Sequence, residues 1–398
     1  MRKFIVISIL FIWIVGIGCE QKQRVDNLKV GRSKLLNAGL ALEAVEPLKI
    51  AVTEEYDKTE PRTLLILAYY HGLSSGSAKT HGLEEEFNLE REKRLEALGD
   101  AEMKFLLELL VKRSRVQKDA MKVLTDKGAG ATPLLINALG KVEYQNIQND
   151  VKDMLATIGS DALNPIISAI RSPDSAPSVK VSLVRLIGRI GDAGVVSDVE
   201  ALGDSTTDAG LKMEINAALY KLGKSNYKSQ ILKGLRASDV KVRRAAAKAI
   251  IDFEEYSASD VIQALGDSDD RVREYVAAVL QKRPDKAAVQ PLVKVLKSDA
   301  DHTAKQAAFD ALKVHVANGL ARRLAADLIR KELLGGNISN PEDRLRIVQL
   351  LREKELIRQI EAAPVELQLK YDLEQYRQNT EQHGLVKSEL GRLLEVLK

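Results

Sequence analysis

The sequence predicts an all-α protein built as a solenoid, that is, a superhelix of stacked helical hairpins. Segments that end in a small residue followed by an aliphatic one recur every 30 to 33 residues between positions 138 and 296. Each is followed by a polar turn and then by apolar residues at the helical spacing i, i+3, i+4, i+7. No segment alternates as a half-buried strand would. The recurring pairs are Ala138-Leu139, Ala169-Ile170, Ala201-Leu202, Gly234-Leu235, Ala264-Leu265 and Val295-Leu296.

The N-terminal segment carries the pattern of an export signal. Two cations, Arg2 and Lys3, precede an apolar run of 15 residues, and Cys19, the single cysteine of the chain, follows it. A bilayer-spanning helix needs about 20 apolar residues. Gly16-Ile17-Gly18-Cys19 resembles the lipobox of bacterial lipoproteins, although Gly16 stands where that family usually has leucine. The resemblance implies removal of residues 1–18 as a signal peptide and acylation of Cys19.

An uncleaved membrane anchor and ordinary secretion are the alternatives for this segment. All three place the body of the protein outside the cytoplasm, and the first predicts a lipid-anchored protein of the cell envelope that faces the periplasm or the cell exterior. The net charge is +4 and falls to +2 once Arg2 and Lys3 are lost. Neither a polybasic nor an acidic excess points to a partner, and nucleic acid is not expected as one. With no second thiol, the chain must be held together by packing.

The segment 19–100 is predicted to be helical and different from the middle of the chain. Small residues recur at Gly39, Ala44 and Gly72, with Pro61 between them, as expected where helices cross. This pattern resembles the tetratricopeptide repeat over little more than one unit. The resemblance implies a tetratricopeptide-like helical segment ahead of the solenoid.

The solenoid itself is predicted over residues 101–335. Pro165–Ile170 and Pro291–Leu296 lie in first helices of the hairpins, and Asp239–Ala246 and Asp269–Arg273 open second helices. These segments resemble the HEAT-like repeats of bacteria, most specifically over about 131–315. In that family, aspartate and arginine pairs form ladders between repeats. The segment 336–398 keeps helical periodicity without the repeat, so it is expected to cap the last apolar face.

Two residue pairs of the turns have an expected structural role. Asp239 and Asp269 stand where a side-chain oxygen can accept hydrogen bonds from the free amides of a helix start. Arg243 and Arg273 follow about one turn later and could reach a carboxylate of their own or a neighbouring unit. A structural ladder is therefore favoured over a ligand site at these positions.

Residues with catalytic or metal-binding spacing are not found in the sequence. None of the five histidines has a second histidine or cysteine three to five residues away, so no zinc spacing exists. No serine occupies a nucleophile elbow. We therefore expect no catalytic residue, no metal site and no cofactor.

One set of side chains is a candidate binding surface. Arg185, Arg189, Lys221 and Lys248 are spaced to form neighbouring rows on second helices, together with Asp252 and Glu274. In the HEAT-like family second helices line the concave face, which usually binds partners. The alternative is a solvated face of ordinary cations. In that case the binding surface is expected around Leu64–Tyr70.

These observations predict a non-catalytic scaffold, anchored in a membrane, that binds a protein partner on a curved helical surface. Two alternatives stay open. Some bacterial HEAT-like proteins are similar to phycobilin lyase subunits, which would make the chain an enzyme subunit. The other alternative is a mainly structural role in the envelope or cell wall.

Overall fold

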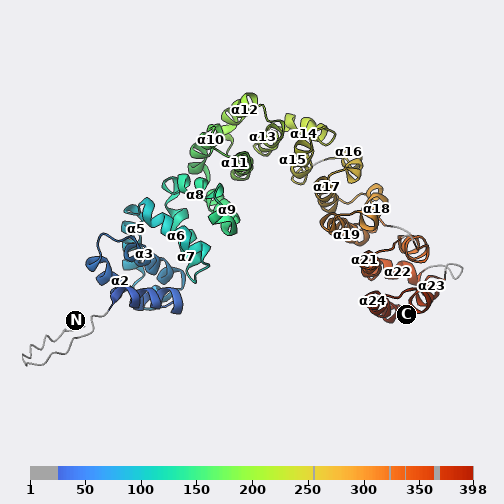
Figure 1. The fold of residues 1–398 in the computed structure, drawn as a ribbon, viewed down its shortest axis with the longest axis horizontal. Coiled ribbons are helices and arrows are strands. Elements are labelled where there is room, and N and C mark those ends of the chain that lie inside the picture. The colour runs from blue at the N-terminus through green and yellow to red at the C-terminus, as the bar shows by residue number, and fades with distance from the viewer. Residues whose placement is uncertain (1–25, 254–255, 322–323, 337, 363–367, 398) are drawn as a thin grey trace, which may run out of the picture. The chain divides into compact units, whose positions relative to one another are not determined.

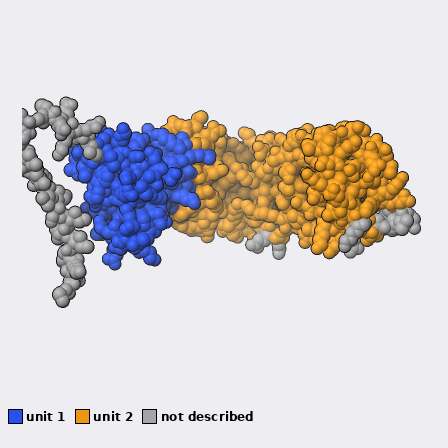
Figure 2. All heavy atoms as spheres, turned by 90° about the horizontal axis from the view of Figure 1, so that it is seen from below, with its two compact units in different colours: residues 1–134 blue, residues 135–398 orange. Residues whose placement is uncertain are grey.

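The computed structural model describes residues 26–253, 256–321, 324–336, 338–362 and 368–397. The predicted signal peptide and Cys19 lie outside these ranges. Within them all regular elements are helices and no strand occurs, so the predicted all-α solenoid is confirmed. The chain divides into two compact units, residues 1–134 and 135–398 (Figure 2). None of the helices in the described ranges has both the length and the apolar character that a bilayer span requires.

The first unit consists of packed helices and has a core of its own. A Cβ on Gly31 would lie 2.5 Å from Leu48 Cγ, and one on Gly72 would lie 2.4 Å from a ring carbon of Phe87. Small residues are therefore required where these helices cross. The helices are α1 (Asn27–Arg32), η1 (Ser33–Ala38), α2 (Ala41–Glu54), α3 (Thr59–Ser74), α4 (Ser77–Thr80), α5 (Glu84–Glu96), α6 (Asp100–Val111) and α7 (Gln117–Asp126).

The segment Leu64–Tyr70 belongs to this core. All seven residues are buried, with Leu64, Leu65 and Tyr69 fully inaccessible. The expectation that this segment could serve as the alternative binding surface is therefore wrong. Pro61 lies in the first turn of α3, where a missing backbone N–H removes no helical hydrogen bond. The resemblance of residues 19–100 to the tetratricopeptide repeat stays a prediction, and the compact units divide at 134/135 rather than at 100/101.

The second unit alternates first and second helices, which lie on opposite sides of it (Figure 1). Consecutive second helices pack against one another from α9 to α19. After α8 (Thr132–Leu139), the first helices are α10 (Leu163–Arg171), α12 (Val196–Ser205), α14 (Lys228–Gly234), α16 (Ala258–Ile262) continued by η7 (Gln263–Gly266), and α18 (Val289–Ser298). The second helices are α9 (Gln148–Ile158), α11 (Pro177–Ile190), α13 (Ala209–Lys221), α15 (Val240–Ile250), α17 (Asp270–Lys282) and α19 (His302–Ala317).

The predicted apolar stripes of the second helices form the core of this unit. Leu183, Ile187, Ile215, Ala246 and Ile250 are all fully buried. The aliphatic members of the six recurring pairs are buried as well, from Leu139 to Leu296. Burial of apolar area at about 25 cal/mol per Å² is the main term that holds such units together. Because each stripe is covered by the neighbouring hairpin, the units depend on their stacking.

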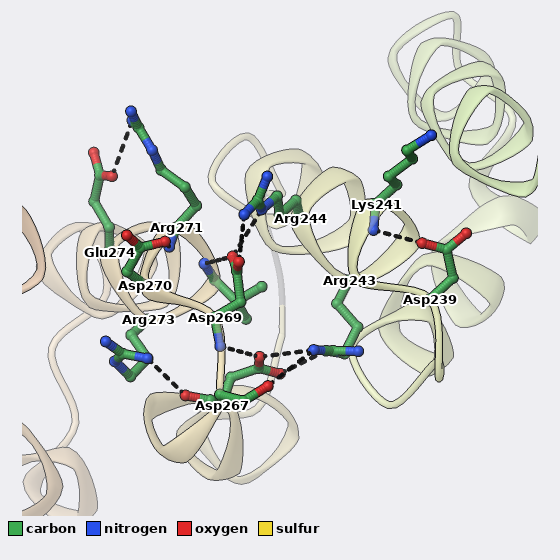
Figure 3. A network of polar contacts seen from close by, with 12 residues as sticks. Asp239, Lys241, Arg243, Arg244, Asp267, Asp269, Asp270, Arg271, Arg273 and Glu274 are labelled. Atoms are coloured by element: carbon green, nitrogen blue, oxygen red, sulfur yellow. Dashed lines mark hydrogen bonds and ion pairs between the residues drawn. The ribbon is translucent and has the colours of Figure 1, made fainter. Parts of the chain in front are cut away.

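The starts of the second helices show the predicted caps and ladder. Asp239 accepts a hydrogen bond from the backbone N–H of Lys241, and Asp269 accepts one from Val272. Arg243 donates to Asp267 of the next hairpin, at 2.7 and 3.1 Å (Figure 3). These contacts confirm the predicted N-caps and the ladder between repeats.

The C-terminal part of the unit contains a contact of the same kind, which the sequence analysis did not foresee. Asn340 caps α21 (Pro341–Leu351), and Arg344 follows the cap by four residues, as Arg243 follows Asp239. Arg344 donates to Glu381, which lies ahead of α24 (Gly384–Val396). The remaining elements here are α20 (Leu324–Asp327), η9 (Leu328–Leu334), α22 (Lys354–Glu361), α23 (Leu369–Gln375) and η11 (Tyr376–Thr380).

Candidate partner-binding groove

The four predicted binding residues line one groove on the second-helix side of α11, α13 and α15. Its volume is about 270 Å³. Gly188 lets α11 approach α13 closely, since a Cβ there would lie 3.1 Å from Ala218 Cα and 3.2 Å from Lys221 Cδ. Small side chains thus form the floor, and long polar side chains form the walls. The lining residues are Arg185, Gly188, Arg189, Glu214, Ala217, Ala218, Lys221, Lys248, Ala249 and Asp252.

Arg185 is held by a buried carboxylate of the next second helix. Its guanidinium donates two hydrogen bonds to Glu214, one of 2.8 Å from Nε to Oε2. The Glu214 side chain is only 7% exposed, whereas that of Arg185 is 41% exposed. Desolvation opposes the charge of Arg185, but the hydrogen bond and charge of Glu214 outweigh it and raise the pKa of the guanidinium. This bidentate pair positions Arg185 firmly in the groove wall.

The ion pair of Arg189 is exposed to solvent, and that of Lys221 is partly exposed. Arg189 Nη1 is 2.6 Å from Asp153 Oδ1, and both side chains are more than half exposed. Lys221 Nζ is 2.7 Å from Asp252 Oδ2, and Lys282 approaches the other oxygen of Asp252 at 3.7 Å. Exposed pairs of this kind contribute about 0.2–1 kcal/mol each to stability.

Lys248 differs from the other three cations. No hydrogen bond or ion pair joins its ammonium group to another described residue. Burial lowers its pKa below the usual lysine value, and the charge of Arg185 lowers it further, against a smaller opposing effect of Glu214. Lys152 and Lys221 add to the decrease. The groove therefore contains one half-buried cation without a counter-ion.

One expectation about the surface is corrected, and it concerns Glu274. Arg185, Arg189 and Lys221 line the groove, and each forms an ion pair with a carboxylate. Glu274 does not belong to the groove and instead lies 3.4 Å from Arg271. Counted from the capping aspartates, Lys248 is the ninth residue after Asp239 but Glu274 only the fifth after Asp269. Counting from the caps would therefore have placed Glu274 one helical turn before the position that corresponds to Lys248.

Glu214 is the residue of the groove that sequence reasoning missed. It directly precedes Ile215 of the buried stripe and is itself buried, and a buried carboxylate is almost always paired. The spacing alone does not name Arg185, because the two residues are 29 positions apart and meet only after the hairpins stack.

A larger hollow of about 660 Å³ lies between η7 and α18. Its polar walls include Asp267, Arg273 and Asp299, which already bond within the ladder. Arg273 donates to Asp299 at 2.5 and 2.6 Å and to the carbonyl of Asp267 at 2.8 Å. These groups are satisfied by one another, so their role is structural.

One cluster in the first unit brings together the residue types of a catalytic triad. His71 Nδ1 lies 2.8 Å from Asp119 Oδ2, and Ser74 Oγ donates to Asp119 Oδ1 at 2.6 Å. The serine therefore bonds the carboxylate rather than the imidazole, and the histidine cannot take its proton. Across the part of the chain that the structure describes, no three His, Cys, Asp or Glu side chains are grouped as metal ligands.

A match to a family model supports the repeat over part of the chain. Residues 229–313 match the family model described as HEAT repeats. Among solved structures, an engineered protein aligns at 16% identity and a TM-score of 0.36, covering 93% of this chain and 98% of its own. The structure of She4p aligns at 10% identity and a TM-score of 0.27, with 93% of this chain and 64% of She4p covered. No curated protein matches the chain.

Proposed function

We propose that the protein is a membrane-anchored scaffold outside the cytoplasm that binds a protein partner on the second-helix side of its solenoid. The groove between α11, α13 and α15 carries the proposal, because it gathers four cations from three stacked helices around a small-residue floor. HEAT-like solenoids present such rows of side chains along one side, and long repeat surfaces suit protein partners. The N-terminal pattern ending at Cys19 supports the anchor.

The exposed charges in and beside the groove suit recognition better than folding. Arg189 and Lys282 are each more than half exposed, so their ion pairs add little to stability. Their field can still steer and orient a charged partner, since electrostatic complementarity acts mainly on association rate and specificity. A partner held this way binds more weakly as salt rises, because charges are screened beyond about 8 Å at physiological ionic strength.

Site-specific photo-crosslinking in cells tests this function. A photoreactive amino acid is placed at Arg189 or Lys282 on the second-helix side, and at Lys233 or Arg236 on the first-helix side as matched controls. All four positions are exposed. We expect one protein to be captured from both second-helix positions and not from the controls. Equal capture from both sides, or none from Arg189 and Lys282, would contradict the proposal.

A further inference from the structure

Lys248 occupies a position that the neighbouring second helices fill with alanine. Counted nine residues from their N-caps, the equivalent residues are Ala217 in α13 and Ala278 in α17. Neither equivalent position supplies a carboxylate, and Ala217 lines the same groove as Lys248. A half-buried ammonium group without a counter-ion destabilises the free protein rather than stabilising it.

The acidic residues of the groove are already used. Both oxygens of Glu214 accept hydrogen bonds from Arg185. Asp252 is shared between Lys221 and Lys282, which approach its two different oxygens. The lining therefore carries four cations, Arg185, Arg189, Lys221 and Lys248, against these two carboxylates, and its excess of positive charge favours one more negative group.

The space beside Lys248 fits a side chain. The volume of about 270 Å³ is far above the roughly 30 Å³ that a water molecule occupies in the liquid. Ala217, Ala218 and Ala249 line its floor with methyl groups. A ligand suited to this arrangement has apolar methylenes that end in a negative charge, which describes glutamate and aspartate side chains.

Resting on the proposed function, we infer that this groove receives a carboxylate side chain of an acidic segment of the protein partner, bound by the ammonium group of Lys248. Arg185 lines the same groove, and its bonds to Glu214 fix its position. The partly exposed Lys221 can reorient toward the bound carboxylate. The carboxylate supplies the counter-ion that the free chain lacks. Binding should then reverse the effect of burial and raise the pKa of Lys248.

Fluorescence anisotropy with labelled hexaglutamate, on the mature full-length protein in detergent at low salt, tests this inference. Lys248→Met keeps the length of the side chain and removes its charge, so affinity should fall at least about tenfold. The thermal midpoint should stay the same or rise, because an unpaired buried charge is lost. Lys248→Arg should bind within a few-fold of the wild type. Lys233→Met, an exposed lysine of α14, is the matched control and should bind unchanged.

Four results would overturn the inference. The first three are the absence of hexaglutamate binding by the wild type, equal binding by Lys248→Met, and equal binding of labelled hexaglutamine. Tighter binding of a twelve-residue oligothymidylate that also depends on Lys248 would likewise overturn it, in favour of nucleic-acid phosphates. The crosslinking from Arg189 and Lys282 separates the two proposals. If the partner is still captured by Lys248→Met at wild-type levels, the scaffold function stands and only the role of Lys248 fails.

Discussion

Arg344 donates hydrogen bonds to both oxygens of Glu381, at 2.7 and 3.1 Å, across 37 residues of sequence. It also donates to the carbonyl of Ser339 in the turn before its own helix. Arg243 makes the same set of contacts, with Asp267 and with the carbonyl of Ser238. Glu381 in turn accepts from the N–H of His383, just as Asp267 accepts from that of Asp269. The ladder thus continues to α24, the last helix that the structure describes.

Removing Arg344 should destabilise the C-terminal hairpins strongly. The Glu381 side chain is fully buried, and without its partner it would remain as an uncompensated charge, which costs about 3–5 kcal/mol. Arg344→Met should therefore increase hydrogen exchange across residues 341–397, measured by mass spectrometry. The double variant Arg344→Met/Glu381→Met should lose less stability than Arg344→Met alone, because no unpaired buried charge is left.

Arg358→Met is the matched control for this experiment. Its pair with Glu355 lies on the surface of α22 at 3.6 Å, so exchange should change by the equivalent of about 0.5 kcal/mol or less. Equal effects of Arg344→Met and Arg358→Met would show that the Glu381 pair adds no more than a surface contact.

Two arginines of the groove should differ in their effect on folding. Arg185→Ala leaves the buried Glu214 without its donors and should cost about 1–3 kcal/mol. Arg189→Ala breaks a pair in which both side chains are 54% exposed and should cost less than about 1 kcal/mol. Urea unfolding followed by hydrogen exchange over α11 and α13 measures both. A larger loss of stability in Arg189→Ala than in Arg185→Ala would mean that solvent exposure does not determine the energy of these ion pairs.

The parts of the fold that were predictable from sequence are those set by local spacing. The stripe through Ile215 and Leu219 and the caps at Asp239 and Asp269 follow from helix geometry within a few residues. The ladder between Arg243 and Asp267 was foreseeable only through the resemblance to known repeats. Its C-terminal counterpart was not, because 37 residues separate Arg344 from Glu381, compared with 24 between Arg243 and Asp267.

The chemistry of the groove was less predictable than its location. The spacing correctly brought Arg185, Arg189, Lys221 and Lys248 together. Which of them is bonded to a carboxylate depends on the stagger of neighbouring helices, which brings Glu214 to Arg185 and leaves Lys248 without such a bond. Stagger arises from side-chain packing such as the close approach at Gly188. A pattern within one helix does not contain that information.

The two units should respond to pH in opposite directions. The hydrogen bond and charge of Asp119 raise the pKa of His71 above 6.5, against desolvation. This contribution to the first unit is complete below pH 6.5 and is lost as pH rises through the folded pKa. Burial lowers the pKa of His315, which donates to the carbonyl of Ala311 and accepts from the N–H of Asp285. The second unit should therefore lose stability as pH falls below 6.5.

Hydrogen exchange at pH 5.5 and 8, corrected for the intrinsic rate, measures the pH dependence of stability for each unit separately. His71→Gln should reduce this pH dependence for residues around α3 and α7. His315→Gln should reduce it for residues around α19. A response of the same sign in both units would contradict the opposite pKa shifts of the two histidines.

Replacing Ile250 by aspartate should unfold more than one hairpin. Ile250 is fully buried in the core that the hairpins share. An unpaired charge there costs several kcal/mol, and the loss of one interface removes support from both neighbours. Circular dichroism should show a lower melting temperature and a broader transition. Ser229→Asp, an exposed position of α14, is the control and should melt like the wild type.

Cys19 should carry the lipid that holds the protein at the membrane. A diacylglyceryl group and an amide-linked chain would bury many methylenes at about 0.8 kcal/mol each, and two or more chains anchor stably where one does not. Cys19→Ala should therefore lose incorporation of an alkyne-tagged fatty acid and leave the membrane fraction or keep its uncleaved N-terminus. The intact mass distinguishes the alternatives. A wild-type chain that still begins at Met1 and carries no lipid would instead be an uncleaved anchor, while an unlipidated chain shortened at its N-terminus would be an ordinary secreted protein.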